Sequence, residues 1–291
     1  MAQRGFPVLV ATDGSPQARA AVELAAEFPW PRGSRGHGIV AHSLPALTAA
    51  SPDVWEALLE AGRAEARRAE ERLRRRWPRA EVIVVDAPPV VGILRQARKL
   101  RARAIVLGSR GLGAVGRLLL GGVSRAIVRQ ASSSVLVVRG PARKPRRLVV
   151  GIDGSPHARR ALALVAGLTP PRGGQVRLLS VVEAVRVPSA ALMPARVRGA
   201  VAREAAELER ERIAQARRPL EVAQTRLERG GWRVRVDVRA GQPLEELLAV
   251  ATDADVLVVG ARGVGGVERL VVGSVAEGAV SRAPVPVLVV R

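Results

Sequence analysis

The sequence predicts an α/β protein of two similar domains, each a parallel sheet with helices on both faces. Short apolar runs without polar alternation, such as Val256–Val259, are typical of strands buried on both sides of a parallel sheet. These runs alternate along the chain with segments of helical periodicity, as in βαβ units. Two landmarks also occur twice, which predicts a tandem duplication.

The two landmarks set the size of the repeat. The stretch Asp13–Pro16 returns at Asp153–Pro156, and a glycine-rich stretch that begins at Gly108 returns at Gly260. The aspartates lie 153 − 13 = 140 residues apart and the glycines 260 − 108 = 152, so the second copy carries 152 − 140 = 12 additional residues in its middle. We therefore expect a first domain over residues 1–140, a linker over 141–147 and a second domain over 148–291.

In the first copy, each expected element has a local signal. A strand at residues 7–11 leads to Ser15 and Pro16, which suit the N-cap and first position of a helix. Prolines and glycines between residues 29 and 38 predict a loop before the second strand. The later elements expected here are a strand at 39–44, a helix at 52–77 rich in arginine and glutamate, a strand at 81–85, a helix from 88 to 100, a strand at 105–107, a short helix and a strand at 134–139.

The second copy repeats this order with one longer helix. Its expected elements are a strand at 148–152, a helix from 156, a strand at 176–182, a helix from about 195 to 228, a strand at 233–238, a helix at 243–251, a strand at 255–259, a short helix at 275–281 and a strand at 285–290.

The composition argues against several classes of protein. The chain has no cysteine, so it forms no disulfide or thiolate metal site, and its three histidines lie far apart without metal-ligand spacing. No apolar run approaches the roughly 20 residues that span a bilayer, and the N-terminus has no signal-peptide core. We expect a soluble, cytoplasmic protein without a membrane partner.

The formal net charge of +21 raises the question of nucleic-acid binding. Proteins that bind single strands interleave their basic residues with aromatic platforms. Here aromatic residues make up 2% of the chain and tyrosine is absent. The charge is therefore interpreted as compositional, and a nucleic-acid partner is not expected.

The glycine-rich stretches have the chemistry of a phosphate cradle. In the second copy a buried strand ends at Gly260, and Gly273-Ser274 opens a short helix. Glycines let backbone N–H groups approach an anion, and the helix N-terminus adds free donors and a favourable dipole. Asp13 and Asp153 follow the first strand of each copy, so they flank the same crevice if the first and fourth strands are neighbours. The alternative is that the glycines only make tight turns.

Two other nucleotide motifs are excluded. Residues 111–116 fit G-x-G-x-x-G by letter, but they follow the fourth expected strand instead of opening the first βαβ unit. No acid lies about 20 residues further on, and the second copy does not preserve the pattern. A G-x4-G-K-[ST] phosphate loop is absent from both copies.

At these residues the chain resembles tandem universal stress proteins of the nucleotide-binding subgroup. The motif G-x2-G-x9-G-[S/T] of that subgroup is matched by Gly260, Gly263, Gly273 and Ser274, and the resemblance covers nearly the whole chain twice. It implies a five-stranded parallel sheet of order 3-2-1-4-5 in each domain and binding of ATP. It also implies that the fifth strands pair edge to edge within the chain, and a homodimer is compatible with it.

The resemblance assigns a set of nucleotide-binding residues to each copy. In the second copy, Asp153 and the backbone of Val181 would face adenine and ribose, and Asp153 would also be a weak Mg²⁺ ligand through the phosphates. The phosphate-binding residues there would be Gly260, Arg262, Gly263, Gly265, Gly273, Ser274 and Val275. The corresponding first-copy residues are Asp13, Gly108, Arg110, Gly111, Gly121, Gly122, Val123 and Ser124.

The first copy departs from the motif. Gly122 stands where a serine or threonine is expected, which removes one hydrogen-bond donor worth roughly 1.5–3 kcal/mol at most. Ser124 is a candidate replacement for that hydroxyl. His42 is interpreted as standing where the second copy has Val181. We expect the first site to bind nucleotide more weakly than the second, or to remain empty.

The sequence therefore predicts an ATP-binding regulatory protein of the stress response, with no catalytic residues and at most slow hydrolysis. One alternative is an interaction module that binds no nucleotide. The other is a weak ATP-hydrolysing or adenylate-handling enzyme, which would need a base or a basic clamp near the loop, and Arg110 and Arg262 are its only candidates.

Overall fold

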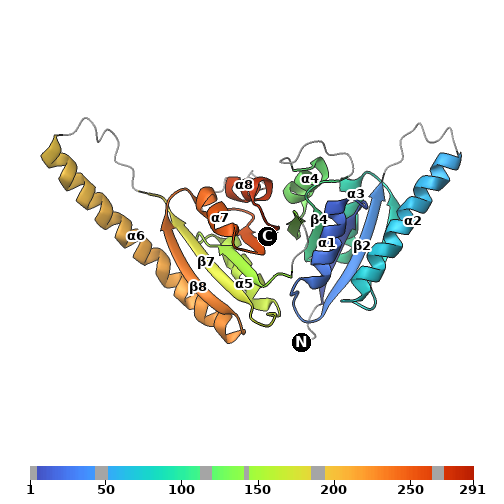
Figure 1. The fold of residues 1–291 in the computed structure, drawn as a ribbon, viewed down its shortest axis with the longest axis horizontal. Helices are drawn as coiled ribbons and strands as arrows, with labels where there is room; N and C mark the ends of the chain where they lie inside the picture. The colour runs from blue at the N-terminus through green and yellow to red at the C-terminus, as the bar shows by residue number, and fades with distance from the viewer. Residues whose placement is uncertain (1–4, 43–51, 112–119, 141–143, 185–193, 264–271) are drawn as a thin grey trace.

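The computed structural model describes residues 5–42, 52–111, 120–140, 144–184, 194–263 and 272–291. Ten strands form one sheet in the order β3-β2-β1-β4-β5-β10-β9-β6-β7-β8, so each half has the order 3-2-1-4-5 that the sequence predicted (Figure 1). The strands are β1 (Phe6–Thr12), β2 (Ser34–His42), β3 (Glu81–Asp86), β4 (Ala104–Gly108), β5 (Ser134–Val138), β6 (Arg147–Gly151), β7 (Gln175–Val182), β8 (Arg233–Ala240), β9 (Val256–Gly260) and β10 (Val287–Val290).

Helices cover both faces of this sheet. One hydrophobic cluster packs α1, α2, α5 and α6 on one face, and a second packs α3, α4, α7 and α8 on the other. Both clusters include residues of both halves, so on each face of the sheet the core continues from one half into the other. The helices are α1 (Pro16–Glu27), α2 (Pro52–Arg74), α3 (Pro89–Leu100), α4 (Gly122–Gln130), α5 (Pro156–Gly167), α6 (Ala195–Arg229), α7 (Pro243–Ala251) and α8 (Ser274–Arg282). Among the described helices, none is long and apolar enough to cross a membrane.

The two halves join at their fifth strands. β10 pairs antiparallel with β5, with Leu288 opposite Leu136, whereas all other strand pairs are parallel. The expected pairing of fifth strands within the chain is therefore confirmed. The loops that follow α1 and α5 also meet, because the N–H of Thr169 donates to the carbonyl of Pro29 at 2.9 Å.

The start of β2 differs from the prediction. Residues 34–38 were assigned to a loop because of their glycines, but they pair with β1 as strand. A Cβ at Gly36 would lie 2.0 Å from the ring of Trp77, and one at Gly38 would lie 2.5 Å from Val82. The glycines are therefore required by close packing against Trp77, which follows α2, and against Val82 of β3, and they do not mark a turn.

Candidate functional site

Each half has a crevice where β1 and β4, or β6 and β9, end side by side. These two strands are direct neighbours in both halves. The aspartate that follows the first strand and the glycine loop that follows the fourth strand therefore flank one cavity, as the sequence predicted. We call the cavity of the first half site one and that of the second half site two.

In site two, a serine ties the aspartate turn to the glycine loop. The Oδ1 atom of Asp153 accepts a hydrogen bond from the N–H of Ser155 at 3.0 Å. The hydroxyl of Ser155 accepts from the N–H of Ala158, which caps α5, and donates to the carbonyl of Arg262 at 3.1 Å. The buried Ser155 therefore positions the loop as well as the helix. The sequence predicted a cap at the equivalent Ser15 of the first copy, but the bond of Ser155 to the loop spans 107 residues and left no local signal.

The glycines of the loop are required by the backbone and side chains around them. A Cβ at Gly263 would lie 2.8 Å from Oδ2 of Asp153. A Cβ at Gly260 would lie 2.9 Å from the backbone N of Ala158, at the first turn of α5. The loop can run this close to Asp153 and α5 only without side chains, which leaves its backbone facing the cavity.

The N-terminus of α8 completes the cradle. Gly273 is the N-cap and makes no side-chain capping bond, so the first N–H groups of the helix are available to a ligand. Ser274 is the first helical residue and its side chain is exposed toward the same cavity. The Nε atom of Arg262 is buried without a hydrogen-bond partner in the described part of the chain. These donors fit an anionic group.

The cavity of site two measures about 620 Å³, a size suited to a nucleotide. The apolar wall opposite the cradle comes from Leu179 and Val181 of β7 and from Pro243 and Leu247 of α7. The predicted residues that line it are Asp153, Val181, Gly260, Arg262, Gly263, Gly273, Ser274 and Val275. The predicted Gly265 lies outside the described residues.

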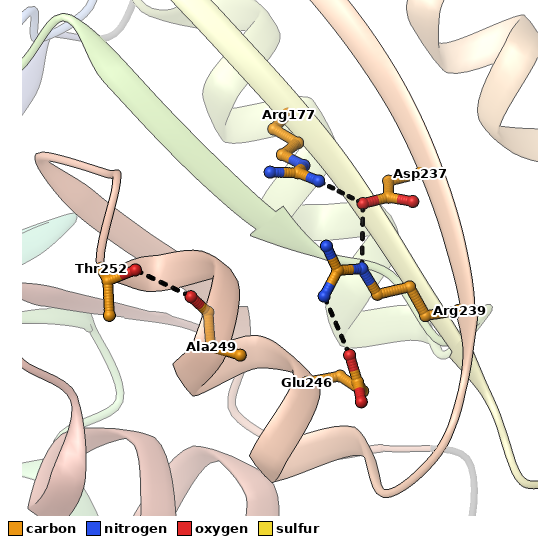
Figure 2. Close-up of polar contacts among 6 residues, drawn as sticks. All are labelled: Arg177, Asp237, Arg239, Glu246, Ala249 and Thr252. Carbon is orange, nitrogen blue, oxygen red and sulfur yellow. Dashed lines mark hydrogen bonds and ion pairs between the residues drawn. The ribbon is translucent and has the colours of Figure 1, made fainter.

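An ion-pair network connects β7 and α7, which form this wall, to the edge strand β8. Arg177 of β7 contacts Asp237 of β8, and Arg239 links the same carboxylate at 3.1 Å to Glu246 of α7 at 3.0 Å (Figure 2). Burial alone would raise the pKa of Asp237, but the hydrogen bonds and charges of the two arginines outweigh it and lower the pKa. The network therefore fastens α7, which carries Leu247, to the edge of the sheet.

Site one repeats this geometry in a cavity of about 510 Å³. The Oδ1 atom of Asp13 accepts from the N–H of Ser15 at 3.0 Å, and the hydroxyl of Ser15 donates to the carbonyl of Arg110 at 3.3 Å. A Cβ at Gly111 would lie 2.3 Å from Oδ2 of Asp13. The predicted residues that line this cavity are Asp13, Gly108, Arg110, Gly111, Gly121, Gly122, Val123 and Ser124.

The first turn of α4 lacks the hydroxyl that Ser274 supplies in site two. Gly122 is the first residue of α4, and a Cβ there would meet nothing within 4 Å, so packing does not require this glycine. The hydroxyl of Ser124 does not replace the missing donor. It is 3% exposed and donates to the carbonyl of Gly108 at 2.7 Å, which fixes the end of β4.

The comparison of His42 with Val181 was wrong by one position. The carbonyl of His42 accepts from the N–H of Ala87, two residues before α3, and the carbonyl of Val182 accepts the equivalent bond before α7. His42 therefore corresponds to Val182, and Ala41 corresponds to Val181. His42 still lines site one, and its Nε2 atom is buried without a partner among the described residues.

Sequence reasoning missed a buried acid beside site one. Glu65 of α2 is 7% exposed, and its carboxylate accepts from the hydroxyl of Thr12 at 2.9 Å and contacts Arg19 at 3.7 Å. A Cβ at Gly14 would lie 3.2 Å from this carboxylate. The only sequence signal was a glutamate on the apolar side of a helix, next to the buried Ala66.

The chain matches the family model described as the universal stress protein family over residues 6–139 and again over 144–291. A universal stress protein of Mycobacterium tuberculosis is 34% identical over 205 residues, which cover 65% of this chain and 62% of the relative. The chain therefore spans less than two thirds of the length of such relatives. A universal stress protein of Thermus aquaticus is 37% identical over 135 residues, which cover 45% of this chain and 97% of that protein.

Solved structures show the same fold. A universal stress protein from Archaeoglobus fulgidus superimposes with a TM-score of 0.67 at 22% identity, covering 98% of this chain and 96% of that one. A protein from Pseudomonas aeruginosa gives a TM-score of 0.58 at 15% identity, covering 99% and 93%. With the family model matching both halves, these findings establish that the chain belongs to the universal stress protein family and carries its domain twice.

Proposed function

We propose that the chain is an ATP-binding regulatory protein of the stress response, and that site two is its stronger site. The observation that carries this proposal is the convergence, in one cavity, of the α8 N-terminus, the glycine loop and Asp153. The phosphates would lie on the donors of the loop, of Ser274 and of the first turn of α8. The base and ribose would lie between Asp153 and the apolar wall around Val181.

Binding, and not chemistry, is the proposed role of this site. Among the described residues that line site two, the ionisable side chains are Asp153, Glu183 and Arg262. Efficient transfer of a phosphoryl group to water requires a general base and a second group that orients it. These three side chains do not form such a pair. Without such a base any hydrolysis would be slow, and Asp153 would approach Mg²⁺ only through the phosphate oxygens. Occupancy would then act by stabilising the folded state and its partner contacts.

The proposal is tested by titrating the purified full chain with Mg-ATP in a calorimeter and by measuring nucleotide released on denaturation. We expect about one strongly bound nucleotide per chain. The double variant Gly273→Val, Ser274→Ala should lose it, and the matched double variant Gly121→Val, Gly122→Ala at site one should keep it. Thermal unfolding of each variant checks that it is folded.

A folded wild-type chain that releases no nucleotide and shows neither heat nor thermal shift with Mg-ATP would overturn the proposal. The family's domain would then serve as an interaction module in this chain. Loss of binding only in the site-one variant would reverse the proposed ranking of the two sites.

A further inference from the structure

Each fifth strand is followed by an arginine that reaches into the other half. Arg139 follows β5, and its Nη2 atom donates to the carbonyl of Val280 in α8 at 3.0 Å. Arg291 follows β10, and its Nη2 atom donates to the carbonyls of Val128 and Arg129 in α4. The two contacts are equivalent, because 291 − 139 = 152 and 280 − 128 = 152, the same offset as between the glycine loops.

The carbonyl of Val280 has no donor within its own helix. α8 closes with the N–H of Ala283 bonded to the carbonyl of Ala279 at 2.8 Å. The next donor would be the N–H of residue 284, but this residue is Pro284 and has none. Arg139 therefore supplies the missing hydrogen bond and places a positive charge at the negative end of the helix dipole.

The helices held in this way are the two that form the phosphate cradles. α4 and α8 have nine residues each, so their N- and C-terminal ends are roughly 13 Å apart. α8 is packed on the sheet through the buried Ala276, Ala279 and Val280. A short, packed helix shifts as one body, so the group that fixes its last turn also fixes the first turn that faces the ligand.

The same helices touch each other across the interface. Arg129 of α4 pairs with Glu277 of α8 at 3.1 Å, and the two helices face each other near the middle of the molecule (Figure 1). Both partners of this pair are exposed, so it contributes little stability. The half-buried Arg139 and Arg291 are the stronger connection, since their bonds to the carbonyls of Val280 and Val128 are partly buried.

Each crossing arginine also lies within reach of the charged loop of its own half. Burial, and then the charge of Arg110, hold the pKa of Arg139 below its usual value. Burial and the charge of Arg262 do the same for Arg291. Phosphate bound beside Arg262 would offset this repulsion and favour Arg291 in its bonded position on α4. The link between the two sites therefore runs in both directions.

We propose that Arg139 is a positioning residue for site two and Arg291 a positioning residue for site one, which couples the two sites across the interface. Each half thus sets the last turn of the helix that binds phosphate in the other half. The coupling of nucleotide binding rests on the function proposed above, whereas the positioning of the helices does not.

The test uses the full-length Arg139→Met and Arg291→Met variants, with hydrogen exchange read separately on the peptides of α4 and α8. Without ligand, Arg139→Met should speed exchange in α8 and leave α4 unchanged, and Arg291→Met should do the reverse. With Mg-ATP, Arg139→Met should weaken binding at site two about fivefold or more. Arg139→Lys, which keeps a charge and donors, should restore part of the loss.

Arg282→Met is the matched control, because Arg282 is also a cation in the last turn of α8, but its Nη1 atom donates to Oε1 of Glu245 in its own half at 2.9 Å. It should leave site two nearly unchanged. Equal effects of Arg139→Met on both helices, or effects confined to α4, would overturn the crossed assignment. If the wild type binds no Mg-ATP, the proposed function fails, and the exchange of α4 and α8 in the ligand-free variants still decides the positioning.

Discussion

The two sites differ most clearly at one residue, the first position of the helix that is proposed to bind phosphate. Site two has Ser274 there and site one has Gly122, while the turns at Asp153 and Asp13 make the same bonds to the serine that follows. A ligand in site one would meet the same backbone donors and lack one hydroxyl. A substitution at this position therefore tests how much the hydroxyl contributes to the difference in affinity between the sites.

Gly122→Ser should strengthen nucleotide binding at site one by roughly tenfold, because it restores a donor to a charged group. The substitution fits, since a Cβ at Gly122 meets nothing within 4 Å. Calorimetric titration with Mg-ATP measures the change. Gly122→Ala is the control, because it also adds a Cβ and removes the freedom of glycine, but it brings no hydroxyl. Equal affinities of the serine and alanine variants would show that the hydroxyl is not the cause.

Ser155→Ala should destabilise the protein by about 1 kcal/mol through loss of the α5 cap, and it should also weaken site two. The second effect is expected because the hydroxyl of Ser155 holds the carbonyl of Arg262. Ser15→Ala is the matched change in the first half, where the equivalent bond reaches Arg110. Chemical denaturation gives the stability, and calorimetry gives the affinity. A Ser155→Ala chain with lower stability and unchanged affinity would leave the serine as a cap alone.

Much of the candidate site could be predicted from sequence because its donors are contiguous. The glycine loop and the start of α8 lie within one motif, and Asp153 follows a strand that is recognisable by itself. Glu65, Arg139 and Arg291 were missed because each acts at a distance: Arg139 contacts a residue 141 positions away, and Arg291 one 163 away. No local pattern marks a side chain whose partner is set by the packing of two halves.

At the scale of elements, the strands were placed well because buried β-branched runs have few alternative structures. Helix α7 was predicted at residues 243–251, as the structure has it. The long α6 was expected near 195–228 and spans Ala195–Arg229 with Pro219 inside it. The predicted start of β2 was too late in the sequence, because glycines there were interpreted as a turn. Gly36 is instead required because the ring of Trp77 leaves no room for a side chain.

The start of β9 is anchored by a buried acid. Asp255 is 9% exposed, and its carboxylate accepts from the N–H groups of Arg146 and Arg147 and from the guanidinium of Arg147 at 2.9 Å. Burial alone would raise the pKa of Asp255, but these bonds outweigh it and hold the pKa below its usual value. The acid therefore joins β6 to β9 at the end of the sheet opposite site two.

Asp255→Asn should destabilise the chain by about 1.5–3 kcal/mol at neutral pH, because bonds to a charged acceptor are weakened. Since the folded pKa is below the unfolded value of about 3.9, the stabilisation is complete above that pH and is lost as pH falls through the folded pKa. Urea unfolding of both proteins between pH 3 and 7 should therefore show a difference that shrinks at the acid end. A difference independent of pH would contradict this account. Nucleotide binding should stay unchanged.

At the scale of the whole molecule, the fifth strands carry the connection between the halves. All four residues of β10 are 2% exposed or less, since β5 covers one edge and helices cover both faces. An uncovered edge of this kind is a template for another strand. The pseudo-twofold relation of β5 and β10 means that a second copy of β10 presents nearly the same partner as β5 does.

Residues 144–291 produced alone should therefore form a dimer through β10 pairing with β10. In that dimer the partner's Arg291 would take the place of Arg139 at the carbonyl of Val280, since the two arginines are equivalent in the repeat. Light scattering after size exclusion measures the mass, and the dimer should be more stable to heat at higher concentration. Leu288→Arg, which puts a charge on the sheet where Leu288 is buried, is expected to disrupt it. A monomer would contradict the expected pairing of β10 with β10. Unchanged hydrogen exchange in α8 of that monomer, compared with the full chain, would show that α8 does not depend on Arg139.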